Sequence, residues 1–373
     1  MIPWINSVGG NKIALSLATE LSREGHEVEV FCLKIRSDLL PEVKQMLGGA
    51  HLSFQGCTNS GSYRRREGFV WAVWSGYDQA LARMIAQSHK ANRLDVVLLV
   101  ANEGFRLARI LRMELADPRP LLGWSLMELM DHSYLLRAER DLSALRSLLG
   151  LLYPAAHWTW HQYLTAYDFL CANSTWTATL LEYLYGLQCG HVLISIPSDA
   201  FESVAAFVQP SGTPYVAVPT VSIARSQYSV LKEIAARGIS LVSYGPKPVP
   251  GTLHLGFLTE EKMRSVLAGA VATLFLFDYE GLGLIPFESI AVGTPVVTLP
   301  KHAVHLQWAG NPYVTFVDRP EGLAQACARW STEPPSKADR DAARATIAQY
   351  AAPAAAKSLL SFLRGITPRS RRP

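Results

Sequence analysis

Cysteine is scarce in this sequence, and its spacing forms no motif. The 373 residues include five cysteines, an odd number, and none of them belongs to a C-x-x-C pair. Disulfide frameworks and zinc knuckles both depend on cysteines paired at fixed spacings. The sequence therefore predicts neither, and unpaired thiols are typical of a reducing compartment.

Long hydrophobic runs and a strong charge are lacking as well. The longest apolar stretches, such as residues 94–101 and 266–277, are too short to cross a bilayer, which takes about 20 residues. No charged-then-apolar leader opens the chain. The net charge of +4 is small for this length and indicates no nucleic-acid partner. We expect a cytoplasmic protein, and the slightly basic charge leaves open a peripheral contact with the inner face of the membrane.

What the sequence does have is apolar segments that alternate between strand and helix patterns. Hydrophobic residues make up 49% of the chain and charged residues 18%, which suits a folded protein with large buried sheets. Predicted strands lie at residues 28–33, 51–55, 95–101, 121–126, 168–172 and 192–196, and in a second series at 217–224, 240–244, 253–257, 272–277, 295–299 and 314–317. Predicted helices of the first series lie at residues 11–24, 77–91, 104–115, 133–149 and 158–167. This alternation predicts an α/β fold with parallel, doubly wound sheets.

The most informative segment is a glycine loop between two glutamates, Glu280 and Glu288. It follows a predicted strand and precedes a short predicted helix, which Pro286 opens and Gly293 closes. A strand that feeds a glycine loop and a helix N-terminus presents backbone N–H groups to a diphosphate. A carboxylate at each end of the loop can accept hydrogen bonds from sugar hydroxyls. The ordinary alternative is a solvated loop acid and an acid in the first helical turn that the helix dipole stabilises.

Four segments together resemble the retaining glycosyltransferases of family four. The first, at residues 279–297, is the Glu-x7-Glu element with the residues after it. The other three look like segments of that family: its glycine loop with the following helix at residues 7–28, the end of its first domain at 168–197, and its base-binding turn at 253–258. The resemblance covers nearly the whole chain. It implies the GT-B architecture, an α/β fold of two Rossmann-like doubly wound domains that face a central cleft.

The resemblance also implies a division of the chain and an activity. An acceptor-binding domain is expected at residues 1–200, a nucleotide-sugar-binding domain at 201–350, and a C-terminal helix with a basic tail that packs back on the first domain at 351–373. The implied enzyme is a hexosyltransferase that uses a UDP- or GDP-sugar, needs no metal or other cofactor, and acts on a glycan, lipid-linked or small-molecule acceptor. Two alternatives stay open: a catalytically silent nucleotide-sugar-binding protein, and an epimerase or hydrolase of the same fold.

Matching residues carry the family's roles by resemblance. Glu280 is expected to contact the hydroxyls of the donor sugar, Glu288 the ribose, and Arg225 the diphosphate, on which negative charge develops during transfer. Backbone contacts are expected from Gly281, Leu282, Gly283 and Leu284 to the sugar and distal phosphate, from Gly256, Phe257 and Leu258 to the base, and from Gly9 and Gly10 beside the reacting centre.

Three features depart from the family pattern. The strand that usually runs into the first glycine loop is expected to be absent. The lysine that accompanies Arg225 is not clearly present, and Lys232 and Lys247 are its candidates. The usual histidine of the first domain is also missing, so Glu128 is predicted to be catalytic by steadying positive charge at the anomeric carbon. His132 is an alternative there, and a locally paired acid is the ordinary interpretation of Glu128.

The sequence contains two further patterns of residues with metal-binding or surface-binding chemistry. His157 and His161 lie four residues apart, but no third ligand accompanies them, so no metal site is predicted. Residues 63–74 mix arginines with aromatic residues. This segment is either a contact for the acceptor or a membrane surface, or a polar loop before a strand with core tryptophans.

Overall fold

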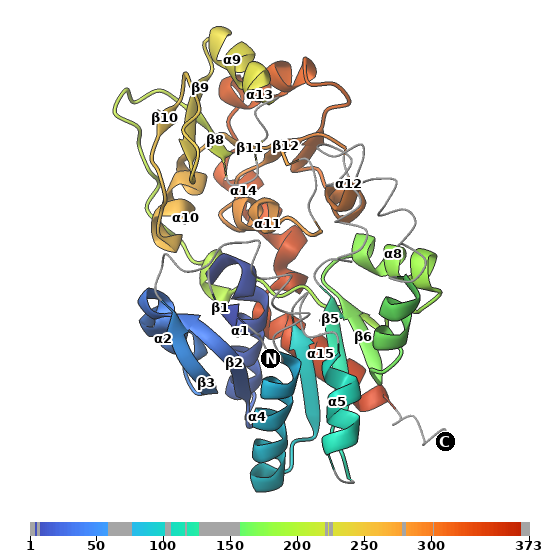
Figure 1. The fold of residues 1–373 in the computed structure, drawn as a ribbon. Coiled ribbons are helices and arrows are strands. Elements are labelled where there is room, and N and C mark those ends of the chain that lie inside the picture. The colour runs from blue at the N-terminus through green and yellow to red at the C-terminus, as the bar shows by residue number, and fades with distance from the viewer. Residues whose placement is uncertain are drawn as a thin grey trace. The chain divides into compact units, whose positions relative to one another are not determined.

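A computed structural model describes most of the chain, and the chain divides into two compact units. The described residues are 4–5, 8–58, 77–100, 106–115, 118–126, 157–220, 223, 227–277, 281–300 and 302–366. Unit 1 comprises Met1–Ser195 and Ala352–Pro373, and unit 2 comprises Ile196–Ala351 (Figure 1). The last helix of the chain therefore belongs to the first unit.

Unit 1 is built from short parallel strands and helices that alternate with them. Its strands are β1 (Trp4–Ile5), β2 (Glu29–Arg36), β3 (His51–Thr58), β4 (Val96–Val100), β5 (Leu121–Leu126), β6 (Phe169–Ala172) and β7 (His191–Val192). Its helices include α1 (Val8–Arg23), α2 (Leu40–Leu47), α4 (Tyr77–Asn92), α5 (Leu107–Glu114), α8 (Thr175–Tyr185) and α15 (Ala352–Gly365). The strands form two hydrogen-bonded sheets, in the orders β1-β2-β3 and β4-β5-β6-β7.

The core of unit 1 joins helices from both ends of the chain. Leu17 of α1, Phe169 of β6 and Leu359 of α15 belong to one buried cluster. Phe362 of α15 packs edge-on against Phe169, with ring centroids 5.7 Å apart. Helix α15 is thus an integral layer of this unit.

Unit 2 holds a single six-stranded parallel sheet. Its strands are β8 (Tyr215–Pro219), β9 (Ser240–Tyr244), β10 (Leu253–His254), β11 (Ala272–Phe275), β12 (Val296–Thr298) and β13 (Val314–Phe316). Its helices include α9 (Tyr228–Ala236), α10 (Glu260–Gly269), α11 (Leu284–Ala291), α12 (His302–Trp308), α13 (Gly322–Thr332) and α14 (Lys337–Ile347). The spatial order β10-β9-β8-β11-β12-β13 is 3-2-1-4-5-6 in chain order, which is the doubly wound arrangement.

The central strands of this sheet are buried on both faces. Every residue of β8 and β11 is buried, as expected for parallel strands covered by helices. Leu231 of α9 and Leu323 of α13 belong to one buried cluster with residues of the sheet. Met263 and Leu267 of α10 belong to another. Two helix layers therefore enclose the sheet.

Local sequence signals set several helix ends. The Ser174 side chain caps α8 by accepting a hydrogen bond from the Thr177 N–H at 3.1 Å, and Gly186 ends that helix in the left-handed conformation at φ 63°. Thr259 caps α10 in the same way. Ser336 and Asp339 form a reciprocal capping box at the start of α14.

The predicted α/β class with parallel sheets is confirmed, and several boundaries are corrected. The first strand was expected to be absent, but Trp4–Ile5 pairs in parallel with Lys34 and Ile35 of β2. The following helix begins at Val8, so Gly9 and Gly10 lie in its first turn and not in a loop before it. The strand predicted at 253–257 ends at His254, because Gly256 turns the chain at φ 68°. The helix predicted at 133–149 lies outside the described residues.

No helix in the described part of the chain is both long enough and apolar enough to cross a bilayer.

Candidate functional site at the switch point of unit 2

The candidate site is defined by the strand order of unit 2. From β8 the chain crosses to β9 on one side, and from β11 it crosses to β12 on the other side. The carboxyl ends of β8 and β11 therefore form a topological switch point, where ligands bind in open α/β sheets. Arg225 follows β8 and Glu280 follows β11 in the sequence, although both residues lie outside the described part of the chain. The two predicted loops thus start from neighbouring strands.

The N-terminus of α11 follows this switch point. Gly283 occupies the N-cap position with φ 76° and ψ 86°, and its lack of a side chain leaves no side-chain cap there. Gly281, Leu282 and Gly283 are buried, and Leu284 is half-buried. A helix N-terminus that follows a glycine pair can turn backbone N–H groups toward an anion. The predicted backbone-binding residues therefore lie on one turn.

Glu288 is placed on α11 more deeply than the sequence suggested. The helix begins at Leu284 and not at Pro286, so Glu288 lies in its second turn. Pro286 is tolerated inside the first turn because that turn has no intrahelical partners for its N–H groups. The side chain of Glu288 is buried, with 5% of its surface exposed. Glu288 is therefore not the first-turn acid, stabilised by the helix dipole, of the ordinary interpretation.

Packing on both sides of Glu288 fixes the orientation of α11. Phe287 is fully buried, and its ring lies 4.4 Å from that of Trp308 and 5.3 Å from that of Tyr350. The Ser289 hydroxyl lies 2.7 Å from the Thr273 hydroxyl on β11 and donates to the Thr294 carbonyl at 2.9 Å. These contacts hold the helix against the sheet and so determine where Glu288 points.

Tyr244, which the sequence analysis did not select, belongs to the same site. It is the last residue of β9 and is 4% exposed, and within the described chain its hydroxyl has no hydrogen-bond partner. Burial, followed by the charges of Glu288 and Glu260, raises the pKa of its phenol well above 10. The signal that could have identified it is a tyrosine at the carboxyl end of a strand beside the switch point.

The structure distinguishes between the two candidate lysines. The Lys247 Nζ atom donates to the Ile223 carbonyl at 3.1 Å, and its backbone N–H donates to the Thr220 hydroxyl at 3.3 Å. Both acceptors lie in the segment that follows β8. Lys232 lies on an exposed position of α9. Lys247 is therefore the lysine that reaches the loop carrying Arg225.

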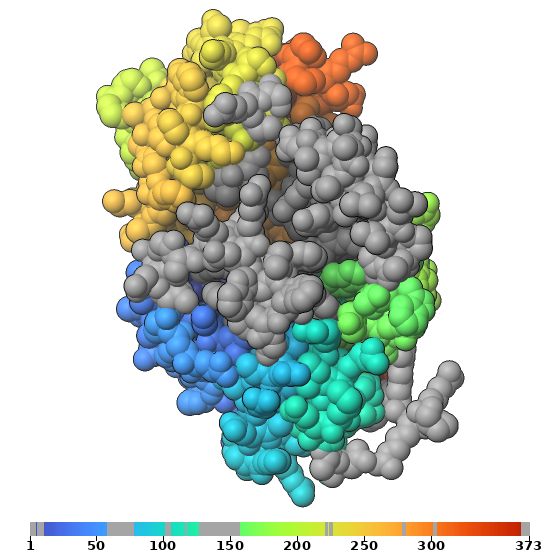
Figure 2. Space-filling model, in the orientation of Figure 1, coloured from blue at the N-terminus to red at the C-terminus, as the bar shows by residue number. Residues whose placement is uncertain are grey.

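The turns after β9 and β10 are hydrogen-bonded to each other. The Gly245 N–H donates to the Gly256 carbonyl at 2.7 Å, and both glycines have positive φ angles, 118° and 68°. Phe257 is 81% exposed and Leu258 is half-buried. The segment around β10 and α10 reaches the surface on the face that Figure 2 shows, in yellow and orange. The three predicted base contacts therefore lie just after the carboxyl end of β10, an edge strand of the sheet.

The predicted residues of unit 1 are placed only in part. Gly9 and Gly10 lie in the first turn of α1, directly after β1. Glu128, His132 and residues 63–74 lie outside the described residues. His157 stacks on Tyr185 with ring centroids 4.5 Å apart. No cluster of three or more potential metal ligands occurs in the described part of the chain.

Comparisons with known proteins bear on the fold. No protein-family model matches the chain, and no curated protein sequence does so either. Among solved structures, the sucrose-phosphate synthase of Thermosynechococcus elongatus is similar at a TM-score of 0.72 and 14% identity, over 97% of this chain and 94% of that one. A glycosyltransferase from Rickettsia africae is similar at a TM-score of 0.66 and 13% identity, over 99% of both chains. The chain has the GT-B fold.

A third GT-B structure carries a ligand. Anabaena HepE, solved in complex with UDP, is similar at a TM-score of 0.64 and 11% identity, over 97% of this chain and 99% of that one. The same protein was also solved with UDP and glucose. The predicted GT-B type is thus confirmed, while the roles of individual residues stay predictions.

Proposed function

We propose that this protein is a retaining, metal-independent glycosyltransferase. It transfers a sugar, expected to be a hexose, from a UDP- or GDP-sugar to a glycan, lipid-linked or small-molecule acceptor in the cytoplasm. The observation that carries the proposal is the strand order of unit 2. In this order the Arg225 and Glu280 segments follow the neighbouring strands β8 and β11, and the Glu280 segment leads into the N-terminus of α11. The UDP and glucose bound by the similar HepE structure support a nucleotide-sugar donor.

Each group at the switch point has a role in this proposal. The backbone N–H groups at the start of α11 hold the distal phosphate, and Arg225 and Lys247 offset the negative charge that develops on the departing diphosphate. Glu288 accepts hydrogen bonds from the ribose, and Glu280 accepts them from the donor sugar. The turn at Gly256 contacts the base. Glu128 of unit 1 steadies positive charge at the anomeric carbon.

Ligand binding can be tested by thermal unfolding in the presence of UDP, GDP and ADP. A ligand that binds only the folded state raises the midpoint by an amount that grows with the logarithm of the ligand concentration divided by the dissociation constant. We expect UDP or GDP to raise the midpoint. In Glu288→Ala the apparent affinity that is derived from this rise should be at least tenfold lower. Glu261→Ala, which removes an exposed acid of α10, is the matched control and should leave the affinity unchanged. Equal affinities in all three proteins would contradict the role of Glu288.

Catalysis can be tested by following radiolabelled donor. Slow release of free sugar would support a transferase, and Glu280→Ala should depress this turnover while binding persists. An altered sugar that stays on the nucleotide would instead indicate an epimerase. Nucleotide binding without any turnover would indicate a silent binding protein.

A further inference from the structure

The phenol of Tyr244 is a buried donor whose backbone is held in place. Among the buried hydroxyls of the described residues, those of Ser125 and Tyr244 lack a hydrogen-bond partner, and Tyr244 is the one in unit 2. The Tyr244 backbone carbonyl accepts from the Thr220 N–H at 2.8 Å and from the Thr220 hydroxyl at 3.0 Å. A phenylalanine would fill the same place without burying an unpaired hydroxyl. Packing alone therefore does not explain a tyrosine at the end of β9.

The strand pattern places the Tyr244 side chain on the face of the sheet that α10 and α11 cover. Val242 and Tyr244 lie two residues apart on β9, so their side chains share one face. Both belong to the buried cluster that includes Val292, against which Ile285 also packs. Glu288 lies three residues after Ile285 and four before Val292, so these three side chains share one face of α11. The buried Glu288 therefore faces the cluster that contains Tyr244.

The electrostatics of Tyr244 agree with this placement. Burial raises the pKa of the phenol well above 10, and the charges of Glu288 and then of Glu260 raise it further. The phenol keeps its proton at neutral pH and is available as a donor. Of the two acids, Glu288 is buried, whereas Glu260 is half-buried. Glu288 is thus the acceptor that a buried donor favours.

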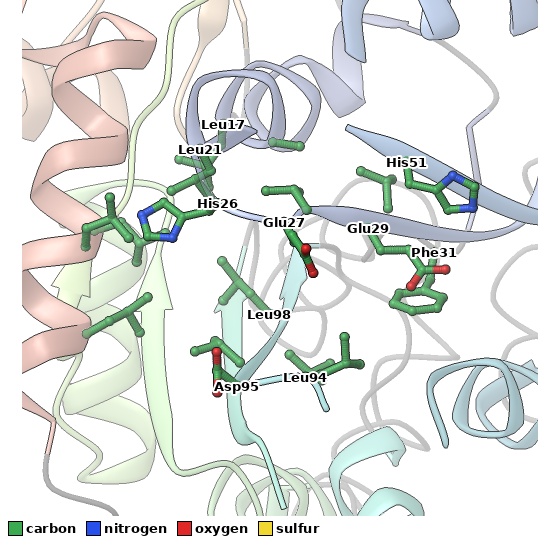
Figure 3. Close-up of a pocket in the computed structure, with 18 of the residues that line it drawn as sticks. Leu17, Leu21, His26, Glu27, Glu29, Phe31, His51, Leu94, Asp95 and Leu98 are labelled. Atoms are coloured by element: carbon green, nitrogen blue, oxygen red, sulfur yellow. The ribbon is translucent and has the colours of Figure 1, made fainter. Parts of the chain in front are cut away.

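Unit 1 contains an acid that hydroxyl donors hold in this way. Glu29 lies in the lining of the pocket of about 740 Å³ that Figure 3 shows. Ser53 donates to one of its carboxylate oxygens and Ser88 to the other, each at 2.5 Å. A carboxylate has two oxygen atoms with about four acceptor positions, so it can accept from a protein hydroxyl and from a further donor at once.

We propose that Tyr244 is a positioning residue for ribose recognition: in the nucleotide-bound protein its phenol donates to one oxygen atom of Glu288, and the other oxygen accepts from the ribose hydroxyls. The role assigned to Tyr244 rests on the proposed function, in which Glu288 binds the ribose. A hydrogen bond from a phenol to a carboxylate is charge-assisted, so it is stronger than one between neutral groups. Tyr244 thereby fixes the direction in which the carboxylate points.

The experiment compares the affinities of UDP and of dideoxy-UDP, which lacks both ribose hydroxyls, by titration calorimetry, or of the GDP pair if GDP binds more tightly. In Tyr244→Phe the affinity for UDP should fall about tenfold and that for dideoxy-UDP less than about twofold, because UDP alone engages the oriented carboxylate. Tyr215→Phe is the matched control, since Tyr215 is buried in the same cluster and its hydroxyl donates to the Val266 carbonyl at 2.7 Å. The control should lower the midpoint of thermal unfolding and keep the ratio of the two affinities.

Double variants test whether Tyr244 acts through Glu288. In the Glu288→Ala background, Tyr244→Phe should change the UDP affinity by less than about twofold, because the acceptor is gone. In the Glu260→Ala background the loss of about tenfold should persist. If the loss persisted without Glu288, the phenol would act on the ligand directly or through Glu260, and the proposal would be overturned. Equal losses for UDP and dideoxy-UDP in Tyr244→Phe, or no loss for either, would overturn it as well.

The original protein and Glu288→Ala separate the role of Tyr244 from the proposed function. A preference of the original protein for UDP over dideoxy-UDP that Glu288→Ala removes supports the ribose contact of Glu288. If Tyr244→Phe keeps this preference, the role of Tyr244 alone is overturned. If the original protein binds neither UDP nor GDP, the proposed function and the role of Tyr244 are overturned together.

Discussion

Gly293 lies directly against Arg340: a Cβ atom added to the glycine would lie 2.5 Å from the Cβ atom of the arginine. The glycine follows α11 at φ 82°, and the Arg340 guanidinium donates to the Thr294 hydroxyl at 3.1 Å. Arg344 of the same helix, α14, donates to the Ala291 and Val292 carbonyls at 3.0 and 3.2 Å. Two arginines thus bind the C-terminal end of the helix that carries Glu288.

Gly293→Ala should destabilise the protein by about 2 kcal/mol or more, because the positive φ costs about 1–2 kcal/mol and the contact with Arg340 adds to it. Urea unfolding measures the change. Gly212→Ala is the matched control, since Gly212 also has a positive φ of 69° but has no atom within 4 Å of an added Cβ. The control should show the backbone cost alone. Equal losses of stability in the two variants would show that Arg340 moves away from the added methyl group without a cost in free energy.

Tyr244→Phe should leave the stability of the unliganded protein unchanged or raise it by up to about 1 kcal/mol. The hydroxyl that it removes is buried and has no hydrogen-bond partner in the described chain, so no bond is lost. Tyr215→Phe is the control, because the Tyr215 hydroxyl donates to the Val266 carbonyl at 2.7 Å. That variant should lose about 1 kcal/mol in urea unfolding. A comparable loss in Tyr244→Phe would reveal a partner for the Tyr244 hydroxyl.

The docking of α15 should weaken in acid through His191. The His191 ring stacks on Phe362 at 5.3 Å, and burial lowers the pKa of the imidazole below 6.5. The folded state therefore prefers the neutral ring, so the stabilisation is complete above pH 6.5 and is lost as the pH falls through the lower, folded-state pKa. In His191→Gln the free energy of unfolding should fall less between pH 7.5 and pH 5 than in the original protein. Parallel pH profiles would contradict this coupling.

Thiol reactivity should separate Cys57 from the other cysteines. Cys57 is exposed, whereas burial raises the pKa of Cys32 and of Cys327 to about 12. Thiolates are the reactive species, so the buried thiols stay protonated and unreactive at pH 8. Ellman's reagent should label one thiol quickly in the native protein and all five after denaturation. Cys57→Ser should remove the fast phase, and persistence of that phase would show that another cysteine is accessible.

The local pattern of apolar and polar residues was sufficient to predict the fold class and the strands that lie inside long apolar runs. The strands at 121–126 and 240–244 were predicted to the residue. β1 was missed because a strand of two residues leaves no alternation to detect. The start of α11 was misplaced because proline favours the first helical position but is also tolerated two residues further in.

The candidate site was predictable only where it is contiguous in sequence. The glycine turn before α11 and the buried Glu288 come from one segment. The proximity of Tyr244 to Glu288 depends on the order of strands in the sheet, which joins segments more than forty residues apart. The contact of Lys247 with the segment after β8 likewise depends on the order of the strands. Such contacts are set by tertiary packing, and no local pattern encodes them.

The assignment of α15 to unit 1 has a consequence for synthesis on the ribosome. Residues 196–351 must be translated before this helix can emerge, which takes between about 8 and 30 seconds at about 5–20 residues per second. During that delay the nascent first unit exposes the apolar surface around Leu17 and Phe169 that Leu359 later covers. Chaperones that recognise exposed apolar chain therefore have a defined interval in which to act on this protein.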